Sequence, residues 1–355
     1  MKLHLSSLCI LAAASSLATY THAAPSLSQV SGTVSHGSSV TVTGSNFGSK
    51  EKASPLVFDD FEAGSSGSKV MMSKAVVGQW QSGAGYDQPT YTTERAYAGS
   101  KSVKLAARPN AYNLSVNQNG SFPVIYMDWW VRVDLLDNVS RNWKPWRVYG
   151  ANDKLQVNGV VMCNGNGLSF LNEQREVGYW WGEGGSFSNG QWQHFQVMMK
   201  ASSAPNVADG AIKQYINGKL VSDHKGLVTR TTSAHWDQIR IGHYWATEAV
   251  DACTSNSGAN IYLDNVYIDT SWAHIELGNA STYSASTKRE IQIPTRWSSN
   301  SITFTVNASS FPSGSTAYLY VTDANGEVNA NGFPVVIGAG SAEKVPAPPA
   351  NVSVQ

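Results

Sequence analysis

The first β-strand pattern in this 355-residue chain needs partners that lie far away in the sequence. Residues 39–44 read SVTVTG, so Val40 and Val42 point to one face of a strand and the threonines point to the other. A hairpin on its own buries too little apolar surface to be stable. Alternating segments that could complete this sandwich follow towards the C-terminus, at residues 290–293, 301–306, 317–321 and 333–337. We therefore predict one small sandwich that is split by a large insertion, although two unrelated β segments would give the same pattern.

The N-terminal segment also carries a family pattern. After the alternating residues the chain continues with Asn46, Phe47 and Gly48. This run resembles the first strands of TIG-type immunoglobulin-like domains, which follow a G-x-x-V-T-V-x-G-x-x-F-G pattern. The resemblance implies an immunoglobulin-like sandwich with a first part at residues 24–55 and a second part at residues 280–340.

The composition restricts the possible partners of the chain. Lys and Arg number 25 and Asp and Glu number 25, so the chain has no net charge. It therefore lacks the basic surface that nucleic-acid binding requires. Charged residues make up only 14%, whereas 12 Trp and 15 Tyr supply many flat aromatic faces. This balance favours a secreted β protein that binds sugars.

The N-terminus is typical of a protein that is exported. Residues 5–17 form an apolar run after Lys2, and Ala23 stands at a position that a signal peptidase reads. We expect cleavage after residue 23 and an extracellular or periplasmic location. No later segment is apolar over the roughly 20 residues that span a bilayer, so we expect no membrane insertion. Cys163 and Cys253 would then remain in an oxidising compartment, either as a disulfide or as two buried thiols.

The large insertion, residues 56–279, is a succession of short alternating strands separated by Gly, Asn, Ser and Asp. This pattern predicts an all-β fold, a jelly-roll sandwich inserted in the smaller one. Residues 341–355 form a proline-rich tail without a packing pattern.

Three segments of the insertion carry a second resemblance. Residues 190–197 read GQWQHFQV, residues 214–220 read QYINGKL and residues 261–268 read IYLDNVYI. Their order and spacing resemble the concanavalin A-like lectin and glucanase superfamily, which includes laminin-G-like lectins and several polysaccharide lyases. The stricter motifs of its lyases, R-x-E-x-R and Y-x-K-x-G-x-Y-x-Q, are absent, so the resemblance implies sugar binding and leaves catalysis open.

The superfamily resemblance also implies a structural Ca²⁺ between the opening and closing strands. Asp60, Glu62 and Asp264 supply carboxylate oxygens at the corresponding places. Strand-end carboxylates that cap turn amides would explain the same residues. No glycine loop for phosphate is present, so we expect no organic cofactor.

The period of two sorts each strand into a core face and an outer face. Trp129, Val131 and Val133 share one face, which places Trp130 and Arg132 on the other; the same sorting applies to the strands around residues 145, 195, 214 and 240. If these strands share one concave sheet, its open face collects a candidate catalytic set and a candidate substrate-binding set. The catalytic set is His194, Tyr215, Tyr244 and Arg147, and the binding set is Trp130, Arg132, Tyr149, Gln196 and Arg240.

Such a face suits an acidic polysaccharide. Guanidinium groups bind carboxylates or sulfates, and aromatic rings stack on sugar rings. Tyr or His could remove the proton next to a uronate carboxyl group in a β-elimination. Each of these residues also has a structural reading, as an edge, hairpin or solvated side chain.

Two other functions compete with this one. A glycosidase needs two carboxylates on one face, and the E-x-D-x-x-E strand that supplies them in the glucanases is absent. We therefore expect a lyase before a hydrolase, if the chain is an enzyme. A structural or adhesive surface protein, capable of self-association, remains the alternative.

Overall fold

The computed structural model describes residues 23–81, 88–105, 114–117, 121–135, 143–150, 155–161, 168–174, 177–181, 188–245 and 259–338. Nearly all regular structure in this part of the chain is β-strand, arranged in antiparallel sheets, so the all-β prediction is confirmed. One short 3-10 helix, Tyr283–Ala285, is the exception among the described elements. No described helix is long and apolar enough to cross a membrane. The predicted signal peptide, the tail and both Cys163 and Cys253 lie outside the described residues, so export and the disulfide stay predictions.

The first sandwich consists of two sheets that pack face to face. The nine-stranded sheet has the order β15-β14-β13-β8-β17-β3-β4, with β6 also paired to β17 and β5 paired to β6. Its strands are β3 (Val57–Asp59), β4 (Val77–Gly78), β5 (Thr90–Thr92), β6 (Ser102–Leu105), β8 (Val124–Leu135), β13 (Trp192–Lys200), β14 (Gly210–Ile216), β15 (Lys219–Leu227) and β17 (Ala259–Asp269).

The six-stranded sheet has the order β12-β11-β10-β9-β16-β7. Its strands are β7 (Leu114–Asn117), β9 (Trp143–Gly150), β10 (Leu155–Val161), β11 (Leu168–Gln174), β12 (Val177–Trp181) and β16 (Trp236–Trp245).

The core between these two sheets comes from the alternating residues. Trp129 and Phe195 of the nine-stranded sheet and Trp146, Val148 and Ile239 of the six-stranded sheet belong to one fully buried cluster. The predicted core faces of these strands are therefore correct. Turn residues match the sequence signals as well: Asn217 and Gly218 have φ of 49° and 76° in the two-residue connection from β14 to β15, where a tight hairpin requires positive φ.

The second sandwich joins the two ends of the chain. One sheet has the order β1-β2-β21-β20 and the other has the order β19-β18-β22-β23. The strands are β1 (Ser26–Ser31), β2 (Ser39–Ser45), β18 (His274–Gly278), β19 (Arg289–Ile291), β20 (Ile293–Trp297), β21 (Ser301–Thr305), β22 (Thr316–Thr322) and β23 (Phe333–Val336).

The register between β2 and β21 shows how the distant segments meet. Val42 lies opposite Ile302 and Val40 lies opposite Phe304, and all four side chains belong to the core of the second sandwich. The first sandwich is therefore inserted between β2 and β18, one strand from each sheet of the second sandwich. The immunoglobulin-like and TIG assignments of this sandwich remain predictions.

One boundary differs from the expected one. Ile275 and Leu277 of β18 belong to the core of the second sandwich, and β18 pairs with β19 and β22. The sequence places these residues in the insertion, before residue 280, because their alternation continues that of β17. The alternation does not show that the chain changes sheets at Ser271 and Trp272.

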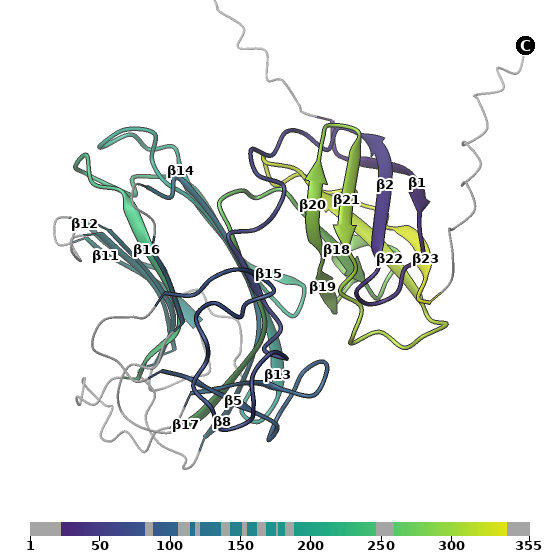
Figure 1. The fold of residues 1–355 in the computed structure, drawn as a ribbon. Coiled ribbons are helices and arrows are strands. Elements are labelled where there is room, and N and C mark those ends of the chain that lie inside the picture. The colour runs from purple at the N-terminus through teal and green to yellow at the C-terminus, as the bar shows by residue number, and fades with distance from the viewer. Residues whose placement is uncertain are drawn as a thin grey trace, which may run out of the picture.

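The second sandwich packs against the outer face of the nine-stranded sheet (Figure 1). Phe58, Tyr126 and Tyr267 of that sheet form a buried cluster with Trp272 and Ile291. The indole N–H of Trp272 is directed at two backbone carbonyl oxygens of the sheet, those of Ile125 at 3.2 Å and Met199 at 3.1 Å. In Figure 1 the six-stranded sheet, with β11, β12 and β16, lies on the side of the molecule away from the second sandwich.

Candidate functional site

The structure divides the predicted site residues between the two sheets. Trp130, Arg132, His194, Gln196 and Tyr215 lie on β8, β13 and β14 of the nine-stranded sheet, and Arg147, Tyr149, Arg240 and Tyr244 lie on β9 and β16 of the six-stranded sheet. The prediction that all nine share one open face is therefore wrong. Alternation decides which side of a strand faces the core, but it does not say to which sheet the strand belongs.

Two of the predicted site residues on the nine-stranded sheet, Trp130 and His194, lie at the junction of the two sandwiches. His194 is fully buried and its Nε2 lies 2.8 Å from Asp128 Oδ1. Its ring stacks on Trp130 at 4.7 Å between centroids, and Trp130 stacks on Tyr97 at 3.6 Å. His194 and Trp130 are therefore packed within the junction and do not line an open face of the sheet.

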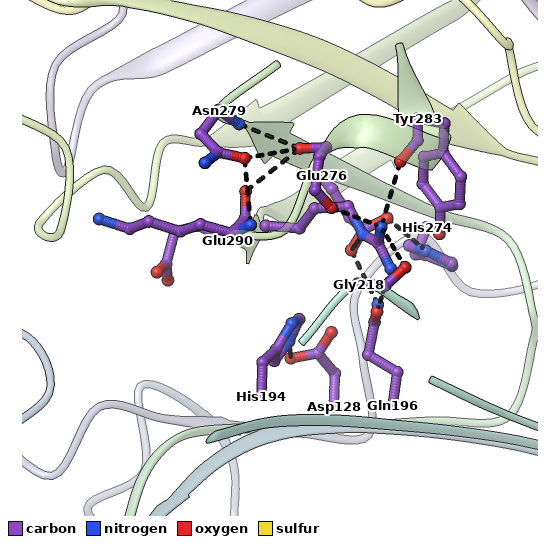
Figure 2. Close-up of polar contacts among 12 residues, drawn as sticks. Asp128, His194, Gln196, Gly218, His274, Glu276, Asn279, Tyr283 and Glu290 are labelled. Atoms are coloured by element: carbon purple, nitrogen blue, oxygen red, sulfur yellow. Dashed lines mark hydrogen bonds and ion pairs between the residues drawn. The ribbon is translucent and has the colours of Figure 1, made fainter. Parts of the chain in front are cut away.

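Gln196 belongs to a buried ionic network across the same junction (Figure 2). Its amide N–H donates to Glu276 Oε1 at 2.8 Å, and its amide oxygen accepts from Arg289 Nη2 at 2.6 Å. Arg289 Nε donates to the same Glu276 oxygen at 3.2 Å. Because Gln196 belongs to the first sandwich and the two charged residues to the second, this network joins the sandwiches. We call Asp128, His194, Gln196, Glu276 and Arg289 the junction network.

Glu276 and Arg289 form a buried ion pair within the junction network. Burial disfavours the ionised form of Glu276, but the Arg289 charge and the neighbouring His274 outweigh it and lower the pKa of Glu276 to about 2. Glu276 is therefore ionised at neutral pH. Tyr215 lies beside the network, with the Arg289 guanidinium 5.4 Å from its ring centroid, and burial raises its pKa above the ordinary value. That shift opposes the role of a proton-abstracting base.

Arg132 lies elsewhere on the nine-stranded sheet. Its Nε donates to Asp134 Oδ1 at 2.8 Å, and Arg95 lies 3.4 Å from the other oxygen of the same carboxylate. The half-buried Arg132 is therefore one member of an ion-pair group on β8, on the opposite sheet from Arg147 and Arg240.

Three of the predicted site residues, Arg147, Tyr149 and Arg240, come together on the outer face of the six-stranded sheet. Arg240 of β16 lies directly opposite Arg147 of β9, and Arg147 lies opposite Asn158 of β10. Neighbouring strands in a sheet are about 4.8 Å apart, so these three side chains form one row across three strands. Tyr149 belongs to the next row, two residues further along β9.

The two arginines enclose Tyr149. Arg147 Nη1 donates a hydrogen bond to the Tyr149 hydroxyl at 2.6 Å. The Arg240 guanidinium carbon lies 4.5 Å from the centre of the Tyr149 ring, and that of Arg147 lies 5.5 Å from it. Tyr149 is only 4% exposed, whereas both arginines are half-buried and present charge to the surface. We call Arg147, Tyr149 and Arg240 the arginine–tyrosine cluster.

Two further residues belong to the strands that form this face, Tyr244 on β16 and Asn158 on β10. Tyr244 pairs with Lys144 beyond an irregularity in β16, but its side chain lies outside the described residues, so its role stays a prediction. Asn158 did not figure among the sequence predictions. The signal that could have found it is its phase, because Val157 faces the core and Asn158 therefore faces outwards.

The three predicted metal ligands each bind backbone amides. Glu62 Oε1 accepts from the amides of Ser100 at 2.7 Å and Lys101 at 2.8 Å, and Asp264 accepts from Tyr97 at 2.8 Å. Asp60 accepts from the amide of Glu62 at 3.1 Å. Within the described ranges, no three His, Cys, Asp or Glu side chains gather closely enough to hold an ion. These contacts fit the capping alternative, and the Ca²⁺ site stays a prediction.

Comparisons with known proteins give the following. No protein-family model matches the chain. No curated protein matches it either. Solved structures similar to part of the chain include the alginate lyase Aly36B, with 14% identity over 61% of this chain and 98% of that one and a TM-score of 0.45. They also include an endo-β-1,4-glucuronan lyase from Trichoderma reesei, with 14% identity over 62% of this chain and 97% of that one and a TM-score of 0.41. A PL-14 alginate lyase from Aplysia kurodai matches with 11% identity over 51% of this chain and 86% of that one and a TM-score of 0.40. With TM-scores below 0.5, these similarities say nothing about the activity of this chain.

Proposed function

We propose that the chain binds an acidic polysaccharide on the outer face of the six-stranded sheet. The observation that carries the proposal is the arginine–tyrosine cluster, in which two half-buried guanidinium groups enclose one tyrosine on adjacent strands. The chain has no net charge, so this is a local concentration of positive charge rather than a general basic surface.

The cluster has the chemistry that an acidic sugar needs. A guanidinium group binds a carboxylate or sulfate with two parallel hydrogen bonds. Arg147 and Arg240 are cross-strand neighbours, so they can bind one anionic group together or two anionic groups on adjacent sugars. An extracellular glycan as ligand also requires export, which the apolar run at residues 5–17 predicts.

The same arrangement would allow a β-elimination on a uronate. In this reaction the proton on the carbon next to the carboxyl group is removed, a carbon–carbon double bond forms, and the bond to the glycosidic oxygen breaks. The oxygen then takes up a proton. Tyr149 would act as the tyrosinate, which the hydrogen bond from Arg147 stabilises. The tyrosinate oxygen takes the proton from the sugar carbon, and the phenol that results gives it to the departing glycosidic oxygen. The guanidinium groups would stabilise the negative charge that develops on the carboxyl group.

Two assays on the mature protein test the proposal. Calorimetric titration with alginate, polyglucuronate and pectate, and with neutral dextran as control, measures binding. Ultraviolet absorbance of the unsaturated product measures elimination. We expect binding to one or more of the acidic glycans and none to dextran, and a lyase would also give product that Tyr149→Phe abolishes.

The outcome that overturns the proposal is equally concrete. A protein that binds none of the acidic glycans, or that binds neutral dextran equally well, does not use the cluster in this way. Ordered filaments in electron micrographs together with indifference to every glycan would favour the structural or adhesive alternative.

A further inference from the structure

We infer that the Asn158 side chain is a specificity residue of the proposed glycan site, and that it selects a uronate carboxylate with a neighbouring hydroxyl group over a sulfate ester. The inference rests on the proposed function. Asn158 is neither charged nor aromatic, the two properties by which the sequence analysis selects site residues.

The backbone of β10 fixes the direction of this side chain. A Cβ atom built on Gly159 would lie 2.5 Å from Nε1 of the core residue Trp146, so position 159 faces the core. Successive residues of a strand point to opposite faces, so Asn158 points to the outer face. There it stands opposite Arg147 in the row that continues to Arg240.

No hydrogen bond within the described residues explains why position 158 is polar. The residue is fully buried, and within the described part of the chain neither its amide nitrogen nor its amide oxygen has a hydrogen-bond partner. Buried polar side chains are nearly always hydrogen-bonded, because an unmade bond costs free energy. Asn117, on the outer face of β7 in the same sheet, differs in this respect: its amide oxygen accepts from Gln238 at 2.6 Å.

An unsatisfied amide beside an arginine matches one kind of ligand group. The amide offers a donor and an acceptor on adjacent atoms. A carboxylate oxygen can accept from the amide nitrogen while it also binds Arg147, and a hydroxyl group on the same sugar can donate to the amide oxygen. In a highly sulfated sugar the neighbouring hydroxyl groups are themselves esterified, so the ligand satisfies the arginines but has no donor left for the amide oxygen. The long Arg147 side chain lies next to Asn158 on the neighbouring strand, and its movement onto the anion would open the way to the amide.

The test compares two acidic ligands and three variants. Asn158→Leu keeps the approximate size of the side chain and removes both polar atoms, and Asn158→Ala is a smaller second variant in case the first does not fold. Asn117→Leu is the matched control. Titration with an oligouronate and with highly sulfated dextran measures the two affinities, and differential scanning calorimetry measures Tm.

We expect both Asn158 variants to bind the oligouronate about 10-fold more weakly, as the loss of two hydrogen bonds in a desolvated site predicts, with sulfated dextran affected by no more than about 2-fold. Asn158→Leu should have a Tm at or above that of the wild type, because it removes two unsatisfied buried atoms. Asn117→Leu should leave both affinities unchanged.

Each other outcome decides against the inference. Equal losses for both ligands would mean that Asn158 does not discriminate between them. Unchanged oligouronate binding in the Asn158 variants, while Arg147→Ala still weakens binding, would overturn the inference and leave the proposed function standing. A wild-type protein that binds neither ligand would overturn both.

Discussion

The junction network and the arginine–tyrosine cluster lie on the outer faces of opposite sheets of the first sandwich, and they differ in exposure. The junction network is buried, and Gln196, Glu276 and Arg289 bond to one another across the boundary between the sandwiches. The arginine–tyrosine cluster is partly exposed and stands next to Asn158, whose amide is unpaired in the described part of the chain.

The difference shows what each group stabilises. A buried charge is tolerated only when a partner of opposite charge and hydrogen bonds compensate for the lost water. The junction network meets this condition within the protein, so it fixes how the second sandwich sits on the nine-stranded sheet. The arginine–tyrosine cluster instead presents two guanidinium groups at the surface, where an acidic ligand would add an ion pair, and the amide of the adjacent Asn158 is unpaired within the described residues.

The substitution with the largest expected effect is one that breaks the junction network. Arg289→Ala leaves the buried Glu276 carboxylate without its cation, and we expect the free energy of unfolding to fall by about 3 to 5 kcal/mol. Urea unfolding followed by tryptophan fluorescence measures the change. Arg296→Ala removes an exposed arginine that takes part in none of these contacts, and it should change stability by less than about 0.5 kcal/mol. Equal effects of the two substitutions would contradict a stabilising role for the network.

The second prediction concerns the pH dependence of the same network. The pKa of Glu276 is about 2 in the folded protein against an ordinary value of 4.5, so its stabilising contribution is complete above about pH 4.5 and is lost as the pH falls towards 2. The contribution at stake is about 3 kcal/mol, because a tenfold change in proton affinity corresponds to roughly 1.4 kcal/mol. The stability difference between the wild type and Glu276→Gln should therefore shrink across this range. A difference that stays constant from pH 5 to pH 2.5 would show that Glu276 is not held ionised by Arg289.

The third prediction separates the two sheets by their arginines. Arg147→Ala and Arg240→Ala should each weaken binding of an acidic glycan by about 10-fold, the usual scale for a charge-assisted contact at a partly exposed site. Arg132→Ala, on the opposite sheet, should change the affinity by less than about 2-fold. Titration calorimetry at two salt concentrations checks both statements, because the first two contacts should weaken as salt is added. A larger loss for Arg132→Ala would move the site to the nine-stranded sheet.

The smallest expected effect is that of Tyr149→Phe on binding. The substitution removes one hydrogen bond with Arg147 and keeps the ring, so the affinity for the glycan should change by about 1 kcal/mol or less. Measured with the same titration, a loss as large as that of Arg147→Ala would mean that the hydroxyl group itself carries the binding. Dextran again serves as the neutral control.

Much of the fold could be predicted from the alternation of residues. The core faces of β8, β9, β13 and β16 are correct, because Trp129, Val148, Phe195 and Ile239 all lie in one core cluster. These predictions succeed because a strand has a fixed period, so one apolar position fixes the others.

The grouping of strands could not be predicted in the same way. Which strands share a sheet depends on pairings between residues far apart in the sequence. Nothing in the local sequence around Trp130 and Arg147 indicates that their strands belong to different sheets. Burial of His194 and Gln196 could not be foreseen either, since it depends on the second sandwich covering their face. Asp128, Glu276 and Arg289, charged residues inside apolar strands, were the available hint of a buried network.

Hydrogen–deuterium exchange with and without a saturating oligouronate tests most directly that the ligand lies on the outer face of the six-stranded sheet. The account predicts slower exchange of backbone amides in β9, β10 and β16 when the ligand is bound, and unchanged exchange in β13 and β14 at the junction. Protection confined to β13 and β14, or no change in β9, β10 and β16 at saturation, would contradict it.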